Sequence, residues 1–229
     1  MTANRERAEA GELPADRDLT AAPAEHLLAE IERLHAALRA AEFKIAELEA
    51  RADVDPLLDI LNRRGFEREL ARSLAYVRRY GTDATLMVID LDGFKGVNDR
   101  HGHAAGDALL KAVAAALRGK VRASDVVARL GGDEFGLVFS PAGETEVLPL
   151  VRKLCENLDR TMAEHDWPIT FSVGVGIFPK VPQNADLVIA FCDRLMQRVK
   201  ALGKNKILHK VYDPDEVETP PPARLRAVL

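Results

Sequence analysis

Two short apolar runs separated by two glycines and two acids constrain the fold of this chain most strongly. Residues 126–130 and 135–139 each have the length and composition of a strand, and only Gly131-Gly132-Asp133-Glu134 lies between them. Paired glycines between apolar runs are a strong signal for a β-hairpin, because glycine reaches the backbone conformations that tight turns need. The sequence therefore predicts a hairpin with two carboxylates at its tip.

Helical and strand-like segments alternate around this hairpin. The run 85–90 is almost entirely apolar and contains β-branched residues, which is typical of a buried strand. We expect further strands at 169–177 and 206–211 and helices at 56–79, 94–100, 104–119, 143–163 and 184–202; Asp55 would cap the first helix, with Pro56 at its first position. This order predicts the fold class α/β, an α+β sandwich with a mixed or antiparallel central sheet flanked by helices.

A heptad pattern precedes these elements. Apolar residues follow one another in alternating steps of four and three, and charged residues flank them, as in a dimeric coiled coil. The seam is Leu27, Ile31, Leu34, Leu38, Ala41, Ile45 and Leu48, flanked by Glu42, Lys44, Glu49 and Arg51. A single helix packed on its own domain is the alternative. We thus expect a disordered N-terminus (1–23), a coiled-coil dimerisation helix (24–52), a folded domain (53–212) and a mobile tail (213–229).

The overall composition excludes several classes of protein. The 229 residues are 47% hydrophobic, which suffices for one sizeable core, and the net charge of −4 gives no basic field that would attract nucleic acid. No run is long and apolar enough for a transmembrane helix, and residues 1–7 lack the apolar core of a signal peptide. We therefore expect a cytoplasmic protein without membrane insertion, in which Cys155 and Cys192 are reduced.

Acidic residues gather at two predicted strand ends. Asp90 and Asp92 end the strand that starts at 85, and Asp133 and Glu134 lie at the hairpin tip. If the hairpin lies beside that strand, like charges meet, which is unfavourable without a cation between them. Carboxylate oxygens of this kind suit Mg²⁺, which also binds substrate phosphates. Solvated turn residues are the alternative for either pair alone.

The segment after Asp92 favours a nucleotide ligand. Gly93-Phe94-Lys95-Gly96 opens a helix, whose free N–H groups and lysine form a phosphate site. Asn98 and Asp107 follow, and such side chains can pair with the edge of a guanine. His101 and His103 lack the further ligands nearby that a tetrahedral metal site needs.

Five motifs in order resemble those of the GGDEF family of bacterial diguanylate cyclases, and together they cover 55–207, about two thirds of the chain. They are Asp55-Pro56-Leu57 with Leu61-Asn62-Arg63-Arg64; 90–95 with Asn98-Asp99 and 102–107; the signature 129–135; Ser172-Val173-Gly174-Val175; and Lys200 with Gly203-Lys204-Asn205. The resemblance implies a fold similar to that of nucleotidyl cyclases and the polymerase palm.

The resemblance also implies roles for the matching positions. Two Mg²⁺ ions per half-site, which Mn²⁺ can replace, would be bound by Asp90, Asp133, Glu134 and the carbonyl of Leu91, with Glu134 alternatively the base near the attacking hydroxyl. Guanine would be read by Asn98 and Asp107. The triphosphate would be held by Gly93, Phe94, Lys95, Lys200 and Lys204, and Gly131 and Gly132 would let the hairpin approach it.

The implied reaction condenses two GTP molecules into cyclic di-GMP and two pyrophosphates at the interface of a homodimer. Each domain would hold one GTP, and the coiled coil would raise the local concentration of the second half-site. Two alternatives stay open: an inactive domain that senses GTP or cyclic di-GMP, and an interaction protein whose coiled coil binds an unidentified regulatory protein.

Arg122 and Asp125 match the RxxD motif of the family in residue type and in spacing from the signature. The resemblance implies an inhibitory product site there, whereas a solvated turn with a local ion pair is the alternative. Some positions depart from the family pattern: Asp59 stands where glycine is common, Gln197 where tyrosine is, and Lys204 where arginine is. Lys204 keeps the charge but loses the bidentate fork. Asp107 favours GTP in both halves, because relatives that make mixed products carry serine there.

Overall fold

The computed structural model describes residues 21–180, 182 and 184–215. It divides the chain into two units, Met1–Glu49 and Ala50–Leu229. Most of the expected disordered N-terminus and mobile tail lies outside the described residues. Among the described helices, none combines the length and the hydropathy that a bilayer span requires.

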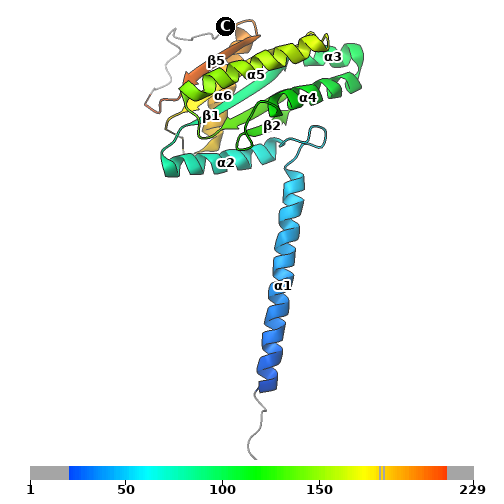
Figure 1. Cartoon of the computed structure of the whole chain (residues 1–229), viewed down its shortest axis with the longest axis vertical. Helices are drawn as coiled ribbons and strands as arrows, with labels where there is room; N and C mark the ends of the chain where they lie inside the picture. Colours follow the sequence, from blue (N-terminus) through cyan, green and yellow to red (C-terminus); the bar gives the residue numbers. More distant parts are fainter. Residues whose placement is uncertain (1–20, 181, 183, 216–229) are drawn as a thin grey trace, which may run out of the picture. The chain divides into compact units, whose positions relative to one another are not determined.

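The first unit contains most of helix α1 (Ala21–Ala52), a single uninterrupted helix (Figure 1). The apolar side chains of Leu27, Ile31, Leu34 and Leu38 are all exposed in the single chain. These residues are the N-terminal part of the expected heptad seam, whereas the side chains of Ile45 and Leu48 lie outside the described residues.

The second unit is built on a five-stranded sheet of order β2-β3-β1-β4-β5. The strands are β1 (Ala84–Asp92), β2 (Val126–Gly131), β3 (Glu134–Phe139), β4 (Thr170–Phe178) and β5 (Lys206–Val211). All neighbours pair antiparallel except β4 and β5, which are parallel, so the sheet is mixed as predicted. β1 lies in the centre and is buried at every position, which explains its almost entirely apolar sequence.

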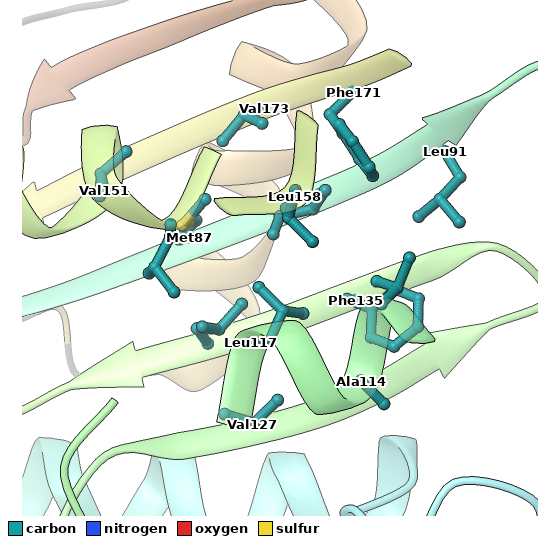
Figure 2. Packing of buried hydrophobic residues seen from close by; sticks show 14 of the residues in the cluster. Met87, Leu91, Ala114, Leu117, Val127, Phe135, Val151, Leu158, Phe171 and Val173 are labelled. Atoms are coloured by element: carbon teal, nitrogen blue, oxygen red, sulfur yellow. The ribbon is translucent and has the colours of Figure 1, made fainter. Parts of the chain in front are cut away.

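Helices cover both faces of this sheet (Figure 1). They are α2 (Arg63–Tyr80), α3 (Phe94–His101), α4 (His103–Arg118), α5 (Glu144–Glu164) and α6 (Ala185–Ala201). Met87, Ile89 and Leu91 of β1 pack in one core with α4 and α5, as Figure 2 shows for Met87 and Leu91, while Leu86 and Val88 pack on the other face with α2 and α6. This alternation follows from the two-residue period of a strand.

The prediction of a helix from Pro56 is wrong in its first turns, because α2 begins only at Arg63. The carboxylate of Asp55 accepts hydrogen bonds from the N–H groups of Leu57 and Leu58, so it stabilises a turn rather than a helix start. Asn62 is the true N-cap, and its side-chain oxygen accepts from the N–H of Gly65. Residues 53–62 thus form a turn that returns the chain alongside β2, with a bridge between Leu61 and Ala128.

Candidate active site

Pairing of β1 with β3 places the hairpin acids beside the end of the central strand. Asp90 lies directly opposite Glu134 in the antiparallel register, and the N–H of Leu91 donates to the carbonyl of Asp133 at 3.2 Å. Gly132 and Asp133 connect β2 to β3 as the hairpin tip. Residues more than 40 positions apart in the sequence therefore bring three carboxylates to one edge of the sheet.

A lysine from α6 partly neutralises this acidic centre. The Nζ atom of Lys200 lies 2.6 Å from Oδ2 of Asp90, a charge-assisted contact. Burial nevertheless raises the pKa of Asp90, with Lys200 acting against it and Asp133 and Asp92 adding to it. Burial likewise raises the pKa of Glu134, helped by Asp90 and Asp193 and opposed by Lys200 and Arg63. The site thus has an excess of negative charge that a further cation would relieve.

The donor set fits a hard divalent cation. Within the described part of the chain, no three His, Cys, Asp or Glu side chains are close enough to hold a metal ion as they stand. Magnesium, however, needs only one or two carboxylates when substrate phosphates complete its shell. Asp90 and Glu134 are oxygen donors whose repulsion and burial both favour such an ion, and Asp133 follows in the hairpin tip.

Asp92, which the sequence analysis grouped with these acids, is engaged elsewhere. Its carboxylate accepts hydrogen bonds from the hydroxyls of Ser172 at 2.9 Å and Thr170 at 3.1 Å, and from the N–H of Asn205 at 3.3 Å. It therefore ties β1 to β4 and to the turn that follows α6. That turn carries Lys204, which is exposed and adopts a positive φ of 63°.

The expected nucleotide segment forms a helix start and a second helix packed against it. Gly93 is the N-cap of α3 in the left-handed region, with φ of 90°, so the first N–H groups of α3 follow directly on β1. Lys95 is exposed in the first turn, and Phe94 is half-buried. These groups are available to a phosphate at the helix N-terminus.

Asn98 of α3 lies against the backbone of α4 at Gly106. A β carbon at position 106 would overlap the side-chain amide of Asn98, so glycine leaves the space in which this amide lies. The contact places Asn98 next to Asp107, the following residue, whose side chain is exposed. Asn98 therefore packs one residue away from Asp107, the other residue that was expected to read a guanine.

Two arginines to which the sequence analysis gave no role hold the hairpin. Arg129 donates from Nε and an Nη atom to the carbonyl of Gly132, and its other Nη atom lies 3.2 Å from the carboxylate of Asp55. Arg63 donates from Nε to the carbonyl of Leu130 at 2.7 Å. Both arginines lie in motifs that the sequence displays, but only the folded chain shows what they contact.

The segment before β2 forms a compact turn. The N–H of Arg122 donates to the carboxylate of Asp125 at 2.8 Å, and the N–H of Asp125 donates to the carbonyl of Arg122 at 3.0 Å. Burial raises the pKa of Asp125, and the hydrogen bond from Arg122 opposes this. The Arg122 side chain itself is exposed, which leaves its guanidinium accessible to an anionic ligand.

The mixed sheet with an acidic hairpin beside its central strand agrees with the fold that the sequence motifs imply. A family model described as "Diguanylate cyclase, GGDEF domain" matches residues 52–206. The chain therefore belongs to the GGDEF family.

Known proteins of this family are similar over most of the second unit. The chain is 33% identical over 158 residues to diguanylate cyclase DosC of Escherichia coli K12, which covers 67% of this chain and 34% of DosC. The chain thus spans about a third of the length of that curated relative.

Two solved structures extend the likeness to the fold. Diguanylate cyclase SiaD of Pseudomonas aeruginosa, in complex with its activator SiaC, aligns with a TM-score of 0.64 at 26% identity and covers 83% of this chain and 79% of its own. The coiled coil and GGDEF domain of DgcB from Caulobacter crescentus, in complex with c-di-GMP, aligns with a TM-score of 0.65 at 24% identity and covers 80% and 99%. At that identity the second likeness concerns the fold alone.

Proposed function

We propose that this chain is a diguanylate cyclase, which condenses two GTP molecules into cyclic di-GMP and releases two pyrophosphates. The observation that carries the proposal is the direct pairing of Asp90 with Glu134 at the end of β1, next to the N-terminus of α3. A cation bound at these carboxylates and a phosphate bound at this helix N-terminus would together meet the requirements for transfer of a nucleotidyl group. The relatives named diguanylate cyclase support the same reaction.

Each domain would bind one GTP with residues of α3, α4 and the turn after α6. The N–H groups at Gly93 and Phe94, with Lys95, Lys200 and Lys204, would hold the triphosphate, and Gly131 and Gly132 would allow the hairpin to lie close to it. Asn98 and Asp107 would read the guanine, because a carboxylate accepts from guanine N–H groups that adenine lacks. GTP would therefore be the substrate of both halves.

Asp90, Asp133, Glu134 and the Leu91 carbonyl would hold two Mg²⁺ ions per half-site, or Mn²⁺ in their place. Bound ions of this kind stabilise the attacking and the leaving oxygen of an in-line displacement. Lys200, which neutralises Asp90 in the ligand-free chain, would then direct its charge to the triphosphate. Glu134 could alternatively accept the proton of the attacking hydroxyl, for which its raised pKa suits it.

Two domains would face each other, and the 3′-hydroxyl of one GTP would attack the α-phosphorus of the other. Because each domain supplies half of the site, activity would require a homodimer. The exposed seam Leu27, Ile31, Leu34 and Leu38 supports dimerisation through α1. Tethering would raise the local concentration of the second half-site.

Arg122 and Asp125 would form an inhibitory site for the product. The turn that they close leaves the Arg122 side chain exposed. A guanidinium group can bind a phosphate or a guanine through two parallel hydrogen bonds. A regulatory protein that binds the chain is a further proposal, since SiaD was solved with an activator. We also propose that the chain works in the cytoplasm, where GTP is available.

Incubation of the purified chain with GTP and Mg²⁺, followed by separation of the nucleotides, tests the proposal. Cyclic di-GMP from the wild type and none from Glu134→Gln would support both the reaction and the site. No product from a dimeric sample stripped of bound nucleotide would contradict it and favour a domain that only senses GTP or cyclic di-GMP.

A further inference from the structure

Arg63, the first residue of α2, contacts the hairpin at two points. Its Nε donates to the carbonyl of Leu130 at 2.7 Å, and one of its Nη atoms lies 3.8 Å from Oε2 of Glu134. Leu130 lies where the register between β2 and β3 shifts, between Arg129 and Gly131. A carbonyl at such an irregularity needs a donor from outside the ladder, and Arg63 supplies it.

The backbone that carries Arg63 is itself fixed. The side chain of the preceding residue, Asn62, caps α2 through the N–H of Gly65 and donates to the carbonyl of Ala52 at 2.7 Å. The N–H of Asn62 donates to the carbonyl of Asp53 at 2.9 Å. Arg63 thus starts from a well-anchored helix end, and its planar fork can address two acceptors at once.

A second carboxylate, Asp193 of α6, lies within electrostatic range of the same guanidinium. Burial raises the pKa of Asp193 and the charge of Arg63 lowers it, while the charge of Asp193 raises the pKa of Glu134. Without Arg63, two half-buried carboxylates from β3 and α6 would repel each other.

We propose that Arg63 is a positioning residue of the reaction, which fixes Glu134 and the Leu130 end of the hairpin from α2. It acts through these two residues and does not touch GTP. The β1–β3 ladder keeps the Glu134 backbone opposite Asp90 and Arg129 holds the Gly132 carbonyl, and Arg63 adds a contact from α2 to the Glu134 side chain itself. The inference rests on the proposed function, since it assigns how the carboxylate of that same site is held.

Steady-state kinetics of Arg63→Gln, Arg63→Lys and Arg72→Gln test the inference. Arg72 is the matched control, because it lies in the same helix, pairs with Glu69 and has a side chain that is 78% exposed. We expect Arg63→Gln to lower kcat on the order of 10- to 100-fold, as a misplaced catalytic group does. The KM for GTP should change by less than about threefold, because binding contacts are untouched. Arg63→Lys should recover part of kcat through its charge, and Arg72→Gln should behave as wild type.

Two kinetic results would overturn the inference. An unchanged kcat in Arg63→Gln would show that Glu134 does not need this anchor. A raised KM with kcat retained would show that Arg63 binds the substrate directly.

Hydrogen exchange separates failure of this inference from failure of the proposed function. Amides of residues 126–139 should exchange faster in Arg63→Gln than in the wild type or Arg72→Gln, whether or not the chain turns over GTP. If the wild type makes no product, the proposed function fails. The difference in amide exchange between Arg63→Gln and the other two proteins still tests whether Arg63 anchors the hairpin. Equal exchange in all three proteins would overturn the anchor on its own.

Discussion

The Nζ atom of Lys200 lies 2.6 Å from Oδ2 of Asp90, and Asp90 is in turn the cross-strand partner of Glu134. The acidic centre of the domain therefore has a counter-ion from α6 before any ligand binds. The positive charge of Lys200 does not offset the effect of burial, which raises the pKa values of both Asp90 and Glu134. In the ligand-free protein, these partly buried carboxylates therefore repel one another, and their ionisation lowers the stability of the folded state.

Glu134→Gln should raise the thermal stability of the metal-free protein near neutral pH. A carboxyl whose pKa in the folded state exceeds the ordinary 4.5 contributes stability that falls as pH rises through the raised value. Glutamine removes this penalty, so we expect the melting temperature to rise by about 1–2 °C at about pH 8, a small effect because the side chain is partly exposed. The difference should shrink as the pH is lowered through the raised pKa and Glu134 takes up a proton. Thermal melts across this range measure it, and a difference independent of pH would contradict the account.

Gly106→Ala should weaken GTP binding although alanine favours helices. The new methyl group would overlap the amide of Asn98 and displace it from the proposed guanine site. Loss of one such hydrogen bond predicts an affinity about tenfold lower, while the helix gains up to about 1 kcal/mol from the removal of glycine. Calorimetric titration with GTP measures the affinity. Since both changes remove the same contact, Gly106→Ala added to Asn98→Ala should cost little more, and additive losses would contradict the link.

Asp59→Gly should stabilise the domain. Asp59 adopts a positive φ of 51°, where an L side chain is strained, and the family commonly has glycine at this position. The carboxylate is almost fully exposed beside Arg118, and Arg118 also binds the backbone carbonyl of Asp59, which glycine retains. We expect a gain of about 0.5–1 kcal/mol, seen as a melting temperature higher by about 1–4 °C. Asp59→Ala is the control and should lower the melting temperature; stabilisation by both variants would contradict the argument from φ.

Arg122→Ala should relieve inhibition by cyclic di-GMP. Loss of a bidentate guanidinium contact predicts that the inhibitory concentration rises by about tenfold or more. Initial rates of GTP turnover at increasing concentrations of added product measure this. The neighbouring variant Ser124→Ala should keep the inhibition of the wild type. If cyclic di-GMP inhibits Arg122→Ala as strongly as Ser124→Ala, the segment is a structural turn and not an inhibitory site.

Patterns of nearby residues predicted much of the fold. The almost entirely apolar run of β1, the apolar runs on either side of the hairpin, and the helical patterns of α4, α5 and α6 depend on neighbouring residues, and the structure confirms these elements. The start of α2 escaped prediction because Asp55-Pro56 is as good a signal for a helix cap as for a turn. The choice between the two is made by contacts with β2, at Ala128 and Arg129, that lie more than 60 residues away.

The candidate site was predictable to the same extent. The proximity of Asp90 and Glu134 was expected on the condition that the hairpin lies beside the buried strand, and the pairing of β1 with β3 meets that condition. The pairing of Lys200 with Asp90, the hydrogen bonds of Asp92 and the contacts of Arg63 each join residues more than 60 positions apart. No local pattern encodes such contacts, so motif membership indicated these residues without indicating what they do.

The product made by heterodimers of wild-type and Glu134→Gln chains tests the central claim of two cooperating half-sites most directly. The two chains are co-expressed with different affinity tags and purified through both, beside wild-type dimers treated in the same way. Since only one half-site is intact, the account predicts a linear dinucleotide with a single phosphodiester bond and little cyclic di-GMP, whereas wild-type dimers give the cyclic product. The account would be contradicted if heterodimers formed cyclic di-GMP at the wild-type rate per intact chain. It would also be contradicted if no species with both tags could be recovered.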